Sequence, residues 1–276
     1  MPDSSSHVTL EIVRTITREA GRVILDYYSK PAPVDYKADD SPLTQADRAS
    51  HRHIVAALRE ATPDIPVLSE ESDPGEIAER RSWDRFWLVD PLDGTKEFIK
   101  GTGQFTVNIA LIEGTEPTLG VVHVPAQNLT YWASSEGAFK QSADAEPEGI
   151  SVREASSEHL TVVASRDHAG PEVAAILERM VAAGVEVESA SMGSSLKFCL
   201  VAEGAADFYP RTVPTMEWDT AAAQCIVEAA GGQVTTLDGE RLRYNKESLR
   251  NPSVMTFGDA AIDWQRYLGA PASSLR

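Results

Sequence analysis

The most constraining feature of this chain is a buried-strand pattern that ends in two acids. The stretch RFWLVDPLDGTKEFIKG, residues 85–101, contains the apolar run Phe86–Val89, which passes at once into Asp90 and then Asp93. Two carboxylates held at close range repel, and each raises the pKa of the other unless a positive charge lies between them. The sequence therefore predicts a cation at the end of this strand.

The next feature is a set of further acids at predicted strand ends and helix starts. Glu70 and Glu71 follow the short strand pattern PVLS, and Asp219 lies in EWDTAA at the start of a late helix. Such positions can direct several side chains to one point. Together with the carbonyl of Leu92, these carboxylates would form an all-oxygen ligand set, which suits Mg²⁺.

Each of these acids also has a simpler interpretation. Asp219 fits a helix N-cap, and Asp47, three residues after Thr44, fits the acid of a capping box. Glu70 and Glu71 fit solvated loop charges. The sequence Asp-Pro-Leu-Asp-Gly fits a surface turn, although the apolar run that leads into it disfavours this reading.

Composition limits the possible partners. The 276 residues carry a net charge of −17, which argues against nucleic acid or an anionic membrane as a partner. A phosphorylated substrate is compatible only if metal ions or a local cationic pocket reverse the field. Cys199 and Cys225 lie in apolar helical contexts that indicate buried thiols, and the sequence shows no signal-peptide or membrane-span pattern. A cytoplasmic protein is expected.

The order of patterns predicts a layered α/β fold. Amphipathic helices are expected over 8–27 and 46–58, followed by successive strands such as FTVNIALI, and then by strands alternating with helices. The polar stretch 141–149 is expected to be a loop near a boundary. It would separate an N-terminal half, 1–145, with most metal ligands from a C-terminal half, 146–276, with Asp219 and the substrate pocket.

Three motifs resemble one known family. LVDPLDGTKEF, SEES and EWDTAAAQCIVEAAGG are similar to the signatures of the Li⁺-sensitive, Mg²⁺-dependent phosphomonoesterases of the inositol monophosphatase superfamily. Within it, DGTKEFIKGTGQFTVNIALI and GSSLKFCLVAEGAADFYPR resemble the 3'(2'),5'-bisphosphate nucleotidase branch. The resemblance implies an α-β-α-β-α sandwich and hydrolysis of the 3'-phosphate of adenosine 3',5'-bisphosphate.

The resemblance also implies a set of metal ligands. One Mg²⁺ would be held by Glu70, Asp90 and the Leu92 carbonyl, and a second by Asp90, Asp93 and Asp219. A third, weaker ion near Glu70 is common in the family. Two such ions would clamp the attacking and leaving oxygens of the phosphoryl group.

The resemblance assigns the remaining roles as follows. Thr95 and Asp47 would orient and deprotonate the attacking water, with Glu70 close by. The residues that would contact the substrate are Asp93, Gly94, Thr95, His168, Ser194, Lys197, Arg211 and Asp219. Lys197 and Arg211 are cations of the kind that a second phosphate requires. Apolar burial of the side-chain stem or a structural ion pair would also explain these two residues. His168 fits a surface or capping role equally well.

Several alternatives stay open on sequence grounds. The same chemistry could act on inositol phosphate or fructose 1,6-bisphosphate, and a non-catalytic nucleotide or metal sensor would keep the same acids. An aspartyl-phosphate phosphatase is disfavoured because its two aspartates lie two residues apart, whereas these lie three apart. A cysteine phosphatase is excluded by Ala205, which stands where the loop arginine would follow Cys199.

Overall fold

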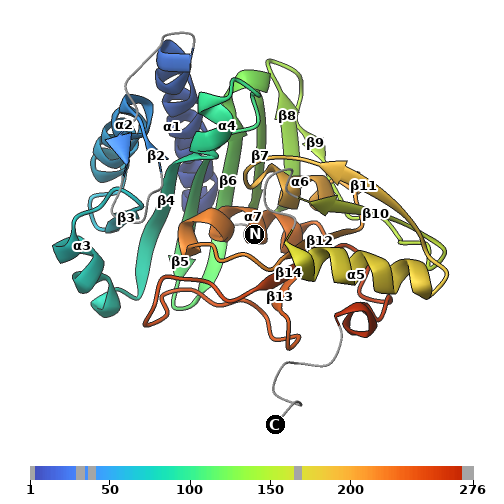
Figure 1. Cartoon of the computed structure of the whole chain (residues 1–276). Helices are drawn as coiled ribbons and strands as arrows, with labels where there is room; N and C mark the ends of the chain where they lie inside the picture. Colours follow the sequence, from blue (N-terminus) through green and yellow to red (C-terminus); the bar gives the residue numbers. More distant parts are fainter. Residues whose placement is uncertain (1–3, 29–34, 37–41, 165–169, 269–276) are drawn as a thin grey trace.

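The computed structural model describes residues 4–28, 35–36, 42–164 and 170–268, which form two mixed β-sheets and the helices around them (Figure 1). The larger sheet has the order β3-β4-β5-β6-β7-β8-β9, and only its first pair is parallel. Its strands are β3 (Val67–Ser69), β4 (Arg85–Asp93), β5 (Thr106–Glu113), β6 (Glu116–Val124), β7 (Leu129–Ser134), β8 (Gly137–Ser142) and β9 (Glu148–Gly149).

The smaller sheet has the order β11-β10-β12-β14-β13, with parallel pairing among the first three strands and antiparallel pairing at β14. Its strands are β10 (His159–Ala164), β11 (Glu186–Ser191), β12 (Phe208–Arg211), β13 (Gln233–Thr236) and β14 (Val254–Phe257). Two further strands of two residues each, β1 (Asp35–Tyr36) and β2 (Pro42–Leu43), pair antiparallel with each other.

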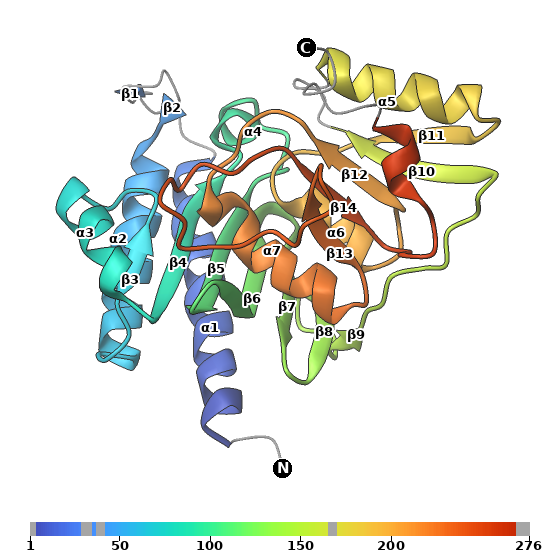
Figure 2. The same cartoon turned by 90° about the horizontal axis from the view of Figure 1, so that it is seen from below.

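Helices lie on the outer face of each sheet and between the two sheets, which gives five layers. Helices α1 and α2 cover one face of the larger sheet, α6 and α7 lie between the sheets, and α5 packs on the far side of the smaller sheet (Figure 2). The expected α-β-α-β-α sandwich is thus confirmed. The helices are α1 (Ser4–Tyr28), α2 (Gln45–Ala61), α3 (Pro74–Glu79), α4 (Thr95–Ile99), α5 (Pro171–Ala182), α6 (Leu196–Ala202) and α7 (Glu217–Ala229), with 3₁₀ turns η1 (Arg80–Ser82), η2 (Pro125–Gln127) and η3 (Trp264–Tyr267).

The middle of the larger sheet is buried on both faces, and β5 is buried along nearly all of its length for that reason. In β5, Val107 and Ile109 belong to the core beneath α1 and α2, whereas Ala110 and Ile112 belong to the core that contains α6 and α7. Successive side chains of a strand point to opposite faces, so a strand covered on both sides shows no polar alternation.

Two elements differ from the sequence-based expectations. The polar stretch 141–149 is not all loop, because its first residues end β8 and Glu148–Gly149 form β9. GAFKQS, the sequence of β8, contains no β-branched residue, so propensity alone does not predict a strand; pairing with β7 supplies it. The division into halves near residue 145 stays a prediction.

Two other features concern the helices. The capping box at the start of α2 is confirmed, since Thr44 accepts from the Asp47 N–H and donates its own N–H to the Asp47 carboxylate. Among the described residues, no helix is long and apolar enough to cross a bilayer.

Helix α7 lies directly against β6 at Gly120, and this contact sets how close the helix can come to the sheet. A Cβ at position 120 would lie 2.3 Å from the Ala222 carbonyl oxygen and 2.9 Å from Cys225 Cβ. Both of those atoms are backbone or near-backbone atoms of α7, which cannot rotate away. The helix that carries Asp219 therefore depends on a glycine in the neighbouring strand.

We expect Gly120→Ala to lower the free energy of unfolding by about 1–3 kcal/mol, because α7 must move off the sheet to admit the methyl group. Urea denaturation measures this loss. Thr118→Ala, an exposed change in the same strand, is the control and should have a small effect. Equal stability of Gly120→Ala and the wild type would show that α7 is not held at this distance.

Candidate active site

The two acids of the DPLD motif lie inside β4, where a β-bulge brings them to the same face of the sheet. Asp90 pairs with Asn108 of β5 and Asp93 pairs with Thr106, so three steps along β4 oppose two along β5. Residues three apart in a regular strand point to opposite faces, and one extra residue reverses that. The surface turn considered above is excluded, since Asp90 and Leu92 are each 1% exposed.

Glu70 and Asp219 join these acids from two neighbouring elements. The Glu70 N–H donates to the Val89 carbonyl, 3.0 Å away, which places Glu70 beside the end of β4. Asp219 is not the N-cap of α7: it stands three residues after the cap, Met216, and its carboxylate accepts the Met216 N–H at 2.7 Å. The hydrogen bond from the Met216 N–H orients this carboxylate toward the acids of β4.

The acids repel one another in the absence of a bound cation. Burial raises the pKa of Asp90 well above its usual range, and the charges of Glu70, Asp93 and Asp219 raise it further. Burial together with the charges of Asp93 and Glu70 likewise raises the pKa of Asp219 well above its usual range. Four carboxylates that destabilise one another in this way form a donor set that a divalent cation would stabilise.

The donor set consists of oxygen ligands, which suit hard cations, but its carboxylates are not close enough together to form an assembled metal site. Throughout the ranges that the structure describes, no group of three or more His, Cys, Asp or Glu side chains has the arrangement of an assembled metal site. Backbone N–H groups hold three of the acids: Leu92 donates to Asp90, Ser195 to Asp93 and Met216 to Asp219.

Thr95 and Asp47 lie next to this acidic group and contact each other. The Thr95 hydroxyl lies 3.1 Å from Asp47 Oδ1 and 3.3 Å from the Leu92 carbonyl oxygen. Asp47 Oδ2 accepts from the backbone and hydroxyl of Thr44, so the capping-box acid also serves the candidate site. Burial raises the pKa of Asp47, opposed by the bonds from Thr44, and makes it a stronger base than an exposed carboxylate.

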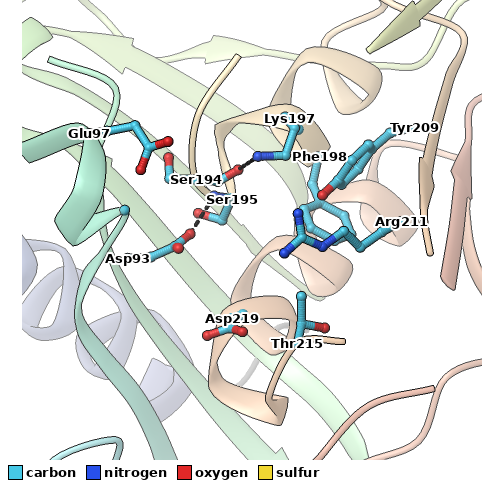
Figure 3. A pocket seen from close by; sticks show the side chains of 11 residues that line it. Asp93, Glu97, Ser194, Ser195, Lys197, Phe198, Tyr209, Arg211, Thr215 and Asp219 are labelled. Carbon is cyan, nitrogen blue, oxygen red and sulfur yellow. Dashed lines mark hydrogen bonds between the residues drawn. The ribbon is translucent and has the colours of Figure 1, made fainter. Parts of the chain in front are cut away.

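A pocket of about 130 Å³ is lined by Asp93 and Asp219 and, on its other side, by cationic side chains (Figure 3). Lys197 of α6 is 4% exposed, and burial lowers its pKa to about 8. Arg211, at the end of β12, donates from Nε to the Val213 carbonyl, and its guanidinium faces the pocket. Ser194 and Gly94 line the pocket beside Asp93.

One predicted residue cannot be placed and several lining residues were missed by the sequence analysis. His168 lies outside the described residues. Ser195 donates its N–H to Asp93 at 2.5 Å, but only its neighbour Ser194 was predicted as a site residue. Glu97, Tyr209 and Thr215 also line the pocket. The motif DGTKEF contains Glu97, but nothing in the sequence shows that α4 directs this side chain inward.

Comparison with known proteins gives one consistent result. A family model described as the inositol monophosphatase family matches residues 6–265. The chain is 49% identical to the 3'(2'),5'-bisphosphate nucleotidase CysQ of Salmonella typhimurium over 246 residues, which cover 88% of this chain and 97% of that protein. The CysQ of Escherichia coli K12 is 49% identical over 247 residues, with the same coverage. A crystal structure of CysQ from Bacteroides thetaiotaomicron superposes with a TM-score of 0.79 at 43% identity and covers 91% of this chain and 97% of that one.

We expect Asp90→Asn to stabilise the protein in EDTA, because it removes the charge at the centre of the acidic group while an amide oxygen can still accept the Leu92 N–H. The free energy of unfolding in EDTA at neutral pH should therefore be higher than that of the wild type. Thermal or urea denaturation with and without Mg²⁺ measures it.

The exposed change Asp84→Asn, just before β4, is the control and should change stability little in either condition. A loss of stability for Asp90→Asn in EDTA would show that the acids are compensated within the protein itself.

Proposed function

Because the chain belongs to the inositol monophosphatase family, we propose that it is a 3'(2'),5'-bisphosphate nucleotidase, which removes the 3'-phosphate from adenosine 3',5'-bisphosphate to give AMP and phosphate. The observation that carries the proposal is the division of charge in one pocket. Carboxylates from β4 and α7 form one side, and Lys197 and Arg211 form the other. An anion that needs cations at both ends fits such a pocket.

Mg²⁺ would be held by Asp93 and Asp219, which line the pocket, together with Glu70, Asp90 and the Leu92 carbonyl beside them. When bound, two Mg²⁺ ions would neutralise these carboxylates, acidify water and stabilise the charge on the phosphoryl oxygens. Carboxylate and carbonyl oxygens are the ligands that Mg²⁺ prefers. Burial, and after it repulsion from the neighbouring acids, raises the pKa of Asp90 and of Asp219, and a bound divalent cation would offset both effects, which supports this assignment.

The protein's own residues would activate the attacking water through Thr95 and Asp47. The Thr95 hydroxyl donates to Asp47 and can accept a hydrogen bond from the water in return. As the water oxygen bonds to phosphorus, its proton would pass through Thr95 to Asp47, and the 3'-oxygen would leave with the electron pair of the broken P–O bond. Burial of Asp47 favours this transfer, because it raises the pKa of the accepting carboxylate.

The cationic side would hold the phosphate that does not react. Arg211 presents a planar fork that matches two phosphate oxygens, and its Nε bond to Val213 fixes the direction of that fork. Lys197 and Ser194 lie beside it. A nucleoside bisphosphate uses both sides of the pocket, whereas an inositol monophosphate uses only one.

The proposal is tested by phosphate release from adenosine 3',5'-bisphosphate, inositol 1-phosphate and fructose 1,6-bisphosphate, each with Mg²⁺ and with EDTA. The nucleotide should be hydrolysed with the highest kcat/KM, and every activity should vanish in EDTA and return with Mg²⁺. A higher kcat/KM on inositol 1-phosphate would refute the substrate, and full turnover in EDTA would refute the metal. Nucleotide binding without turnover would indicate a sensor.

We expect Thr95→Ala to lower kcat by about 10²–10⁴-fold with little change in KM, because a proton-transfer contact is needed mainly in the transition state. Steady-state kinetics on the nucleotide measures both constants. Thr95→Ser keeps the hydroxyl and should retain most of the activity. If Thr95→Ala changed only KM, Thr95 would belong to binding rather than to water activation.

A further inference from the structure

The segment between β11 and α6 adopts a backbone conformation that needs support. Ser194 has a φ of +49°, in the left-handed region that residues with a Cβ rarely occupy. Such a conformation persists only where surrounding contacts hold it, and it is typical of functional sites. Ser194 lines the candidate active-site pocket, so the contacts that hold it bear on the site.

On one side of Ser194 the segment contacts the loop before β5, and on the other side it contacts β5 itself. The Gly193 N–H donates to Gln104 Oε1 at 3.0 Å, and a Cβ at Gly193 would lie 2.7 Å from the Gln104 carbonyl oxygen. The Ser195 hydroxyl lies 2.7 Å from Asn108 Oδ1 and 2.8 Å from the Thr106 hydroxyl, both on β5. These contacts hold the two ends of the segment. They do not involve the C=O or the N–H of the peptide group between Ser194 and Ser195.

That single peptide group is held at both of its polar atoms. Its carbonyl oxygen, on Ser194, accepts from Lys197 Nζ at 2.7 Å, and its N–H, on Ser195, donates to Asp93 Oδ2 at 2.5 Å. A peptide group is planar, so the direction of the C=O fixes the direction of the N–H. A cation on the carbonyl also polarises the group and strengthens the N–H as a donor.

The position of Lys197 suits this contact. Its side chain is 4% exposed and folds back from the first turn of α6 toward Ser194, with Nζ 5.4 Å from the centre of the Tyr209 ring and 3.5 Å from the Met192 carbonyl oxygen. A cation in the first turn of a helix is disfavoured by the helix dipole. A carbonyl partner compensates for that placement, and the contact is drawn in Figure 3.

We propose that Lys197 is a positioning residue for Asp93, acting through the Ser194–Ser195 peptide group. The ammonium holds the carbonyl, the planar group transmits the orientation, and the Ser195 N–H directs the Asp93 carboxylate into the acidic side of the pocket. This inference rests on the proposed function, in which Asp93 is a Mg²⁺ ligand. Lys197 would then have a structural role in addition to its proposed contact with the substrate.

The two roles of Lys197 predict opposite changes in Mg²⁺ affinity. If Lys197 were only a cation near the site, Lys197→Met would remove a charge that repels Mg²⁺, and binding would stay equal or become tighter. If Lys197 positions Asp93, the same change should weaken Mg²⁺ binding by about tenfold or more, which is typical when the partner that orients a metal ligand is lost. Isothermal titration of each variant with MgCl₂ alone, without substrate, measures the affinity.

Arg211→Met is the matched control, because it removes a neighbouring cation of the same pocket without touching the Ser194–Ser195 peptide. Its Mg²⁺ affinity should equal or exceed that of the wild type. Equal or tighter Mg²⁺ binding by Lys197→Met would overturn the proposal.

A second pair of variants covers the case in which Lys197→Met does not fold. Ser194→Gly adopts the left-handed conformation without strain. Lys197→Met should therefore fold in that background and should still bind Mg²⁺ about tenfold more weakly than Ser194→Gly alone. Equal affinity of the two proteins would overturn the proposal.

Amide hydrogen exchange without metal separates failure of this inference from failure of the proposed function. Lys197→Met should speed exchange of the Ser195 amide, because its peptide group loses one of its two partners, whereas Arg211→Met should not. If the wild type bound no Mg²⁺, the proposed function would fail, and the exchange rates would still decide whether Lys197 holds this peptide group. An unchanged rate would overturn the inference itself.

Discussion

The candidate site depends on how one strand is paired. In β4, three steps from Asp90 to Asp93 lie opposite two steps of β5, and this extra residue turns both carboxylates to the face that meets α6 and α7. Regular pairing would send one of them into the core beneath α1 and α2. The cost of placing two repelling acids on one face, one buried and one half-buried, therefore follows from the pairing of this strand. The remaining acids, Glu70 and Asp219, and the cations come from other elements, among them α6, α7 and β12.

The division of charge across the pocket explains how a chain with a net charge of −17 could receive an anion. The acids that line the pocket come from β4, α4 and α7, and the cations from α6 and β12, so the two charges reach the pocket from different elements. The field at a phosphate is set by these near groups, because the distant surface charges are screened by salt. Net charge limits the class of partner but does not describe the site.

The sequence predicts those parts of the site that depend on local chemistry. The capping box of Thr44 and Asp47 needs only residues three apart on one helix, and the order of acids follows from strand ends. The β-bulge in β4 depends on how this strand pairs with β5, which local sequence does not show, so the bulge was not predicted. For the same reason DPLDG could also be interpreted as a surface turn. The hydrogen bond from Lys197 to the Ser194 carbonyl depends on the left-handed backbone conformation of Ser194, which the identity of the residue does not predict.

The packing of α7 against β6 also has a consequence for the order in which the site is made. Asp93 leaves the ribosome 126 residues before Asp219. Until α7 follows, the sheet face that contains the DPLD acids lacks the helix that packs directly on Gly120. The growing chain thus exposes apolar strands together with repelling carboxylates for nearly half of its synthesis, until this late helix covers them.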